Sequence, residues 1–211
     1  IEDELSLLAD LQEELQAAGY EVRGAASAAL QAVQGGWAEG GPDGPIRLSH
    51  PDLPDLVFDP VTGAAQLLEW IRPLWPADKP APARLVQGPT GWTDVAQPWI
   101  SILSLASLRD LEARLNRPLG IERWRANLWL EGWDGYAERD LIGHILSIGD
   151  VELRVTETIG RCPATSADTV TGRIDIDMPE ALRTQFGHSE FGIYAEVVSG
   201  GDIALGDEVR I

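Results

Sequence analysis

The thiol of Cys162 is the side chain with the clearest chemical potential, because it is the only cysteine among the 211 residues of the chain. It lies in the segment Gly-Arg-Cys-Pro-Ala-Thr, residues 160–165. A thiolate is both a nucleophile and a soft metal ligand, and a neighbouring cation such as Arg161 favours its formation. A lone cysteine is also often a small buried apolar residue, so both interpretations stay open until other groups join it.

Two further segments contain groups that hold anions. Three donors lie at the mouth of an expected strand within residues 122–128: Arg123, Arg125 and Asn127. Residues 99–108 have the pattern of an apolar strand that runs into a helix, with Ser104 at the junction. Serine is a common helix N-cap, and the amides of a helix N-terminus bind anions. Together these segments predict an anion site.

Four segments, taken in chain order, resemble motifs of the MOSC domain family. They are residues 99–108, 122–128 and 160–165, followed by a closing stretch from Phe191 to Val209 that is rich in Gly-Asp pairs. This family includes the C-terminal domains of molybdenum-cofactor sulfurases, the mitochondrial amidoxime-reducing component and its bacterial relatives. The resemblance covers about residues 90–211, and the ordered set is specific where no single motif would be.

The resemblance implies roles for individual residues. In metal-binding members, the cysteine of an Arg-Cys-x-x-Thr motif ligates molybdenum, and this cysteine corresponds to Cys162. An Arg-Pro-Asn motif helps to grip the pterin and its phosphate. The implied cofactor is the molybdenum cofactor (molybdopterin), with Cys162 as metal ligand and catalytic residue. The implied cofactor-binding residues are Ser104, Arg123, Arg125, Asn127, Arg161 and Thr165.

The chain also departs from the family pattern. Ala126 stands where the Arg-Pro-Asn motif has its proline, which removes a residue with a fixed φ. Complete members carry an N-terminal barrel in which a lysine and an Asp-Arg pair face the cofactor phosphate. Neither is recognisable here, since the only lysine is Lys79 in a Pro-rich linker. We therefore expect an altered N-terminal half.

Asp168 is a second catalytic candidate. The resemblance places an aspartate at this point, inside a loop closed by Gly172. With Asp175 and Asp177 it could act as one of a pair of carboxylates in acid or base chemistry. A solvated acidic loop is the alternative. The three histidines are too far apart for the usual zinc spacing, so a zinc site is not expected.

Composition excludes several classes of partner. The net charge is -18, with 16 basic against 34 acidic residues, which predicts no binding to nucleic acid or to an anionic membrane surface. No apolar run approaches the roughly 18 residues of a membrane span. One cysteine cannot form an internal disulfide, and no signal peptide is visible. We expect a cytoplasmic protein.

Periodicity predicts the elements that must position these groups. Apolar residues at helical spacing predict helices at 3–18, 63–71, 104–115 and 177–187, with a shorter one at 25–34. Runs of β-forming residues predict strands at 46–49, 56–58 and 151–156, and the last of these leads to Cys162.

The expected fold is α+β and mainly β: a MOSC-type β-barrel with a few peripheral helices and an atypical helical N-terminal segment. We expect a helical segment at 1–43 and a strand, helix and linker segment at 44–89, a possible remnant of the family's N-terminal barrel. The MOSC domain would follow at 90–211.

Three hypotheses for function follow. The leading one is an enzyme, a molybdenum-cofactor oxidoreductase that reduces N-oxygenated small-molecule substrates with electrons from a redox partner protein. The second is a sulfur carrier, in which a cysteine desulfurase loads Cys162 as a persulfide that Arg161 stabilises. The third is a degenerate MOSC domain that binds without catalysis, which the altered N-terminal half favours.

Overall fold

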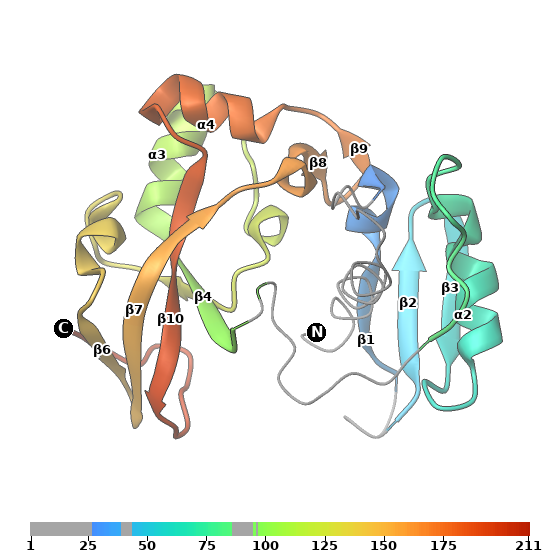
Figure 1. Ribbon diagram of the computed structural model, residues 1–211, viewed down its shortest axis with the longest axis horizontal. Helices are drawn as coiled ribbons and strands as arrows, with labels where there is room; N and C mark the ends of the chain where they lie inside the picture. The colour runs from blue at the N-terminus through green and yellow to red at the C-terminus, as the bar shows by residue number, and fades with distance from the viewer. Residues whose placement is uncertain (1–26, 39–43, 86–94, 96) are drawn as a thin grey trace. The chain divides into compact units, whose positions relative to one another are not determined.

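The computed structural model describes residues 27–38, 44–85, 95 and 97–211 (Figure 1). The helix expected at 3–18 lies outside these ranges. The described residues form two compact units. The first contains the described residues up to 85 together with 166–176, and the second contains those from 95 to 165 and from 177 to 211. Each unit is described separately.

The first unit is built on an antiparallel three-stranded sheet in the order β1-β2-β3, which packs against helix α2 (Figure 1). Its elements are η1 (Ala28–Ala32, a 3-10 helix), β1 (Gln34–Trp37), β2 (Ile46–His50), β3 (Leu53–Phe58), α2 (Ala64–Ile71) and η3 (Arg72–Leu74, a 3-10 helix). Apolar side chains of β2, β3 and α2 form its core: Ile46, Leu48, Phe58, Leu67 and Ile71. The two strands and the longer helix expected here are confirmed.

The short helix expected at 25–34 is confirmed in part, as the 3-10 helix Ala28–Ala32. Val33 takes an extended backbone with φ -69° and ψ 124°, and Gln34 begins β1. The extended residue therefore ends the helix at Ala32. The sequence analysis expects one segment to end at residue 43 and the next to begin at 44. Because β1 pairs with β2, strands on both sides of this expected boundary belong to one sheet.

Residues 166–176 belong to the first unit, although they lie inside the range that the sequence assigned to the MOSC domain. They form a hairpin of β8 (Ala167–Asp168) and β9 (Arg173–Ile174). Gly172 has φ +65°, and a Cβ at this position would lie 3.0 Å from Ala29 Cα. The hairpin can therefore approach η1 this closely only with glycine at residue 172.

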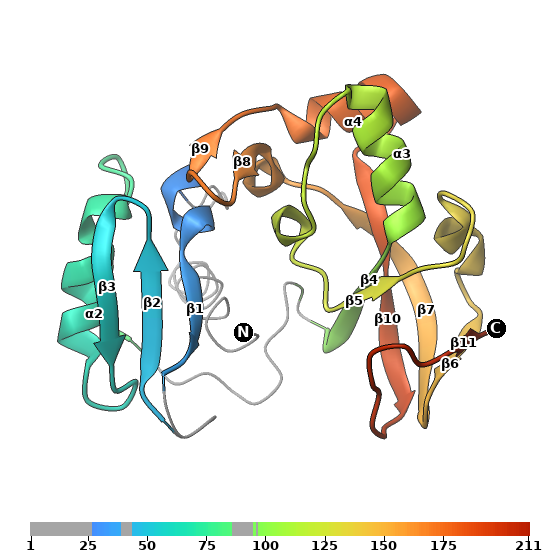
Figure 2. The same ribbon diagram turned by 180° about the vertical axis from the view of Figure 1, so that it is seen from behind.

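The second unit is a six-stranded, barrel-like sheet in the order β11-β6-β7-β10-β4-β5 (Figures 1 and 2). Its strands are β4 (Trp99–Ser104), β5 (Leu128–Leu130), β6 (Ile145–Ile148), β7 (Val151–Gly160), β10 (Glu190–Ser199) and β11 (Val209–Arg210). Only β4 and β5 pair in parallel; the other pairs are antiparallel. The core lies between these strands, with Ile102, Leu146, Leu153 and Ile193 fully buried.

Two helices lie side by side at one end of the long strands β7 and β10 (Figures 1 and 2). These are α3 (Leu105–Leu115) and α4 (Met178–Phe186). The Arg114 guanidinium of α3 lies over the Phe186 ring of α4 at 5.3 Å. Both expected helices are confirmed, with Asp177 as N-cap and Gly187 as C-cap of α4. Short 3-10 helices complete the unit: η4 (Glu122–Trp124), η5 (Ala137–Leu141) and η6 (Pro163–Ser166), the last of which runs into the hairpin.

The expected fold class is confirmed: the molecule is α+β and mainly β, with a barrel-like sheet and peripheral helices. Within the described ranges, no helix is both long enough and apolar enough to cross a bilayer.

Candidate functional site

Cys162 lies two residues after the end of β7 and is exposed to solvent. Its carbonyl oxygen accepts two hydrogen bonds from Thr165, one from the backbone N–H at 3.2 Å and one from Oγ1 at 2.8 Å. Thr165 is itself 6% exposed, so the turn between the two residues closes on a buried side chain. The turn therefore has a fixed main chain and presents the thiol to solvent.

Arg161 anchors the other side of this turn. Its backbone N–H donates to Ser189 O at 2.8 Å, and its Nε donates to Phe191 O at 2.8 Å. Nη1 donates to Trp124 O at 3.0 Å, and the guanidinium lies 5.5 Å from the centre of the Trp124 ring. These bonds turn Arg161 toward main-chain carbonyls of neighbouring elements.

Trp124 is the platform under this guanidinium. It is 1% exposed, and its ring centre lies 4.2 Å from that of Phe191. Such a pair buries a large apolar area in a fixed geometry. Trp124 is therefore a core residue of the second unit.

Arg123 and Arg125 have different environments although the sequence predicts the same role for both. Arg123 is 3% exposed; its Nε donates to Leu119 O at 3.2 Å and its Nη1 to Thr165 O at 3.0 Å. Arg125 is half-buried and has a left-handed backbone with φ 52°. Because non-glycine residues rarely adopt this conformation, it marks a constrained point in the motif.

Asn127 fastens β5 to β4. Its Oδ1 accepts from both the N–H and the hydroxyl of Ser101, each at 2.8 Å, and its own N–H donates to Ser101 Oγ at 3.0 Å. The amide oxygen of Asn127 is thus engaged with the neighbouring strand, whereas the sequence predicts Asn127 as a donor to an anion.

Ser104 is the N-cap of α3, as expected. It is 1% exposed, and its Oγ accepts from the Ser107 N–H at 3.4 Å. The Ser107 hydroxyl lies 2.7 and 2.9 Å from the two carboxyl oxygens of Glu138 and also accepts from the Tyr136 N–H at 2.8 Å. An internal acid therefore lies next to the first turn of this helix.

Glu138 was not singled out from the sequence. It lies in a run of charged residues that would normally be exposed, yet it is 1% exposed. Burial raises the pKa of this carboxyl, while the Ser107 hydroxyl partly offsets the rise. Nothing in the local pattern indicates such burial.

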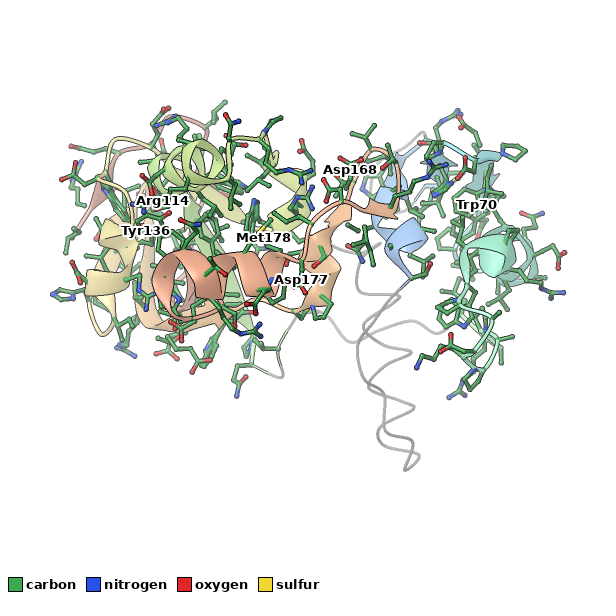
Figure 3. All side chains as sticks on the ribbon, turned by 90° about the horizontal axis from the view of Figure 1, so that it is seen from above. Trp70, Arg114, Tyr136, Asp168, Asp177 and Met178 are labelled. Carbon is green, nitrogen blue, oxygen red and sulfur yellow. The ribbon has the colours of Figure 1, made fainter. Side chains whose placement is uncertain are left out.

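Asp168 belongs to the first unit, at the β8 end of the hairpin; it is labelled in Figure 3. Its Oδ1 accepts from the Val170 N–H, the Thr171 N–H and the Thr171 hydroxyl at 3.2, 2.7 and 2.7 Å. Its carbonyl accepts from the Gly172 N–H at 2.8 Å. The carboxylate therefore orders the tip of the expected loop.

The second unit brings four of the predicted site residues into one connected network: Arg123, Arg161, Cys162 and Thr165. The soft sulfur is exposed, and the two guanidinium groups hold the main chain behind it. Within the described ranges, no group of three or more His, Cys, Asp and Glu side chains could hold a metal ion by itself.

The model of the MOSC domain family matches residues 94–210. The chain belongs to the MOSC family. Its match to the human mitochondrial amidoxime-reducing component 1 is 37% identical over 122 residues, 52% of this chain and 36% of that protein. The rat mitochondrial amidoxime reducing component 2 is 32% identical over 122 residues, with the same coverage.

The aligned part of this MOSC chain thus spans little more than a third of these curated relatives. Among solved structures, YiiM from Geobacillus stearothermophilus is 23% identical with a TM-score of 0.42, and the match covers 52% of each chain.

Proposed function

We propose that this MOSC protein binds the molybdenum cofactor through Cys162 and reduces N-oxygenated compounds with electrons from a separate redox partner protein. Similarity to proteins named amidoxime-reducing components supports the reaction class. The observation that carries the proposal is the exposed thiol on a turn whose main chain is fixed on both sides.

The donor set of the turn fits such a cofactor. A thiolate is a soft ligand, and a solvent-exposed sulfur can accept a metal without moving the core. Cys162 would ligate the molybdenum, and the half-buried Arg125 would face the anionic part of the pterin.

The other predicted residues would hold the backbone around Cys162 and Arg125. Thr165 and Arg161 hold the main chain of the turn, Asn127 fixes the strand that follows Arg125, and Ser104 caps α3. When bound, the cofactor supplies two-electron chemistry that removes the oxygen of an N-oxygenated substrate as water, with two protons and two electrons taken up. The protein's share is to hold the ligand and the cofactor in one orientation.

Molybdenum analysis tests the proposal. The full-length protein, purified from a host that makes the cofactor, should contain close to one molybdenum per chain and reduce an amidoxime when a chemical electron donor is supplied. Cys162→Ser should lose both the metal and the activity while folding normally, because the side chain is exposed. A wild-type protein without molybdenum would overturn the proposal.

The sulfur carrier is the second candidate, since an exposed thiol is also what a persulfide needs. Arg161, however, directs two of its donors to Phe191 O and Trp124 O, which weakens its expected role in stabilising the persulfide. Incubation with a cysteine desulfurase followed by mass spectrometry separates the two hypotheses. A mass gain of one sulfur that Cys162→Ala abolishes would favour the carrier.

The binding-only alternative expects a narrow, occupied pocket around Cys162, whereas the residue is exposed.

A catalytic role for Asp168 remains a proposal, and its carboxylate already accepts three hydrogen bonds within its own loop. The cytoplasmic location is also a proposal, and the curated relatives are named as mitochondrial.

A further inference from the structure

We infer that Arg123 is a positioning residue for the Cys162 turn and does not contact the cofactor. It forms one half of a reciprocal brace, of which Arg161 is the other half. The inference deepens the proposed function and rests on it for its catalytic meaning, but the brace can be measured in protein without cofactor.

The brace consists of two crossed hydrogen bonds between η4 and the Cys162 turn. Arg123, on η4, donates from Nη1 to Thr165 O at 3.0 Å. Arg161, on the turn, donates from Nη1 to Trp124 O at 3.0 Å. Each segment therefore supplies one guanidinium and receives the other at a main-chain carbonyl, so that neither can shift along the other without breaking a bond.

Thr165 carries this restraint to the cysteine. Its carbonyl accepts from Arg123, while its N–H and its hydroxyl both donate to Cys162 O. Cys162 is thus held through its own carbonyl by Thr165, the residue that also accepts the hydrogen bond from Arg123. The Phe191 carbonyl adds a third anchor, because it accepts from Arg161 Nε at 2.8 Å.

Burial separates Arg123 from a ligand-binding role. With 3% of its surface exposed and Nε donating to Leu119 O, its guanidinium is enclosed by protein. Arg125, two residues later, is half-buried. The planar fork of an arginine can serve two carbonyls in different directions at once, a geometry that the single ammonium of lysine does not reproduce. Of the two arginines in the motif, Arg123 therefore belongs to the brace and Arg125 to the ligand contact.

The test uses the cofactor-free full-length protein. In Arg123→Met, the Thr165 amide should exchange with solvent about tenfold faster or more, because the turn loses the charge-assisted hydrogen bond to Thr165 O, while amides of β7 stay unchanged. The pH–rate profile for alkylation of Cys162 should shift in the same variant, and Arg123→Lys should recover part of both effects. Arg125→Met should leave the exchange and the alkylation unchanged in cofactor-free protein, and should retain less molybdenum when it is purified from a host that makes the cofactor. Arg109→Met, which removes an exposed ion pair with Glu131, controls for the loss of an arginine.

Unchanged exchange and alkylation in cofactor-free Arg123→Met, together with loss of molybdenum, would mean that Arg123 contacts the cofactor, and the inference would be wrong. If Arg123→Met does not fold, the wild-type protein decides: the Arg123 side-chain N–H groups should exchange slowly by NMR compared with those of Arg109. Fast exchange would overturn the brace. A wild-type protein that never binds molybdenum refutes the proposed function alone, since the brace measurements need no cofactor.

Discussion

Gly192 lies between the core and the candidate site. It follows Phe191, whose carbonyl anchors Arg161, at an irregular point in the pairing of β10 with β7. Its φ is +87°, and a Cβ added there would lie 2.5 Å from Leu103 Cδ1 and 3.0 Å from Ile102 O. Leu103 is fully buried, so it has no open space into which to move.

Gly192→Ala should destabilise the protein through two effects. A left-handed backbone costs a non-glycine residue about 1–2 kcal/mol, and overpacking of a filled core costs about 1–3 kcal/mol more. The expected loss in the free energy of unfolding is therefore about 2–5 kcal/mol. Because the shift would also move the Phe191 carbonyl, Cys162 should become more reactive toward alkylating reagents.

Gly187→Ala is the matched control. Gly187 has a similar φ of +79°, but an added Cβ would meet nothing within 4 Å, so only the backbone cost of about 1–2 kcal/mol should appear. Urea denaturation measures both variants. Equal losses in the two would refute the claim that close packing against Leu103 fixes this part of β10.

Two further predictions concern Glu138 and Asn127. Because burial raises the pKa of Glu138, the folded state holds its proton more tightly than the unfolded chain, and its contribution to stability falls as pH rises above the unfolded value of 4.5. The stability of Glu138→Gln relative to wild type should therefore increase between about pH 4 and about pH 7 in urea denaturation, and a constant difference would contradict the assignment. Asn127→Ala should lose about 1–3 kcal/mol because it leaves the Ser101 N–H without its acceptor, whereas Asn127→Asp should keep most of the stability and lose cofactor through its added charge. Equal stability of Asn127→Ala and wild type would show that the bond to Ser101 contributes nothing.

The sequence predicted those elements whose local signals agree with their packing. Helix α3 has an apolar stripe and a serine N-cap, and α4 has an aspartate N-cap and a glycine C-cap, so pattern and capping indicated the same bounds. Strand β7 alternates buried and exposed residues along most of its length, which is the period-two pattern of a half-buried strand. In these places the local preference and the tertiary structure coincide.

Local sequence does not indicate the structure where distant contacts decide it. Gly35 and Gly36 have the composition of a loop, yet they lie in β1 because β2 offers them a pairing partner. The hairpin at 166–176 packs with the first unit through Gly172, and this contact has no counterpart in the local sequence.

In the candidate site, too, local signals predicted some residues, and distant contacts decide the environment of others. Sequence motifs identified Cys162, Arg161 and Thr165, which the structure joins in one turn. They could not distinguish Arg123 from Arg125, since burial depends on the elements that close over each side chain. The burial of Glu138 was not predicted for the same reason, because a charged residue in a charged run carries no local signal that it will be buried.

The central claim is that the Cys162 sulfur is a ligand of the molybdenum. The most direct test compares molybdenum X-ray absorption spectra of the full-length wild-type protein and Cys162→Ser, each purified from a host that makes the cofactor. The account predicts that any molybdenum retained by Cys162→Ser has one sulfur ligand fewer than in the wild-type protein. Identical sulfur coordination and equal metal content in the two proteins would contradict it.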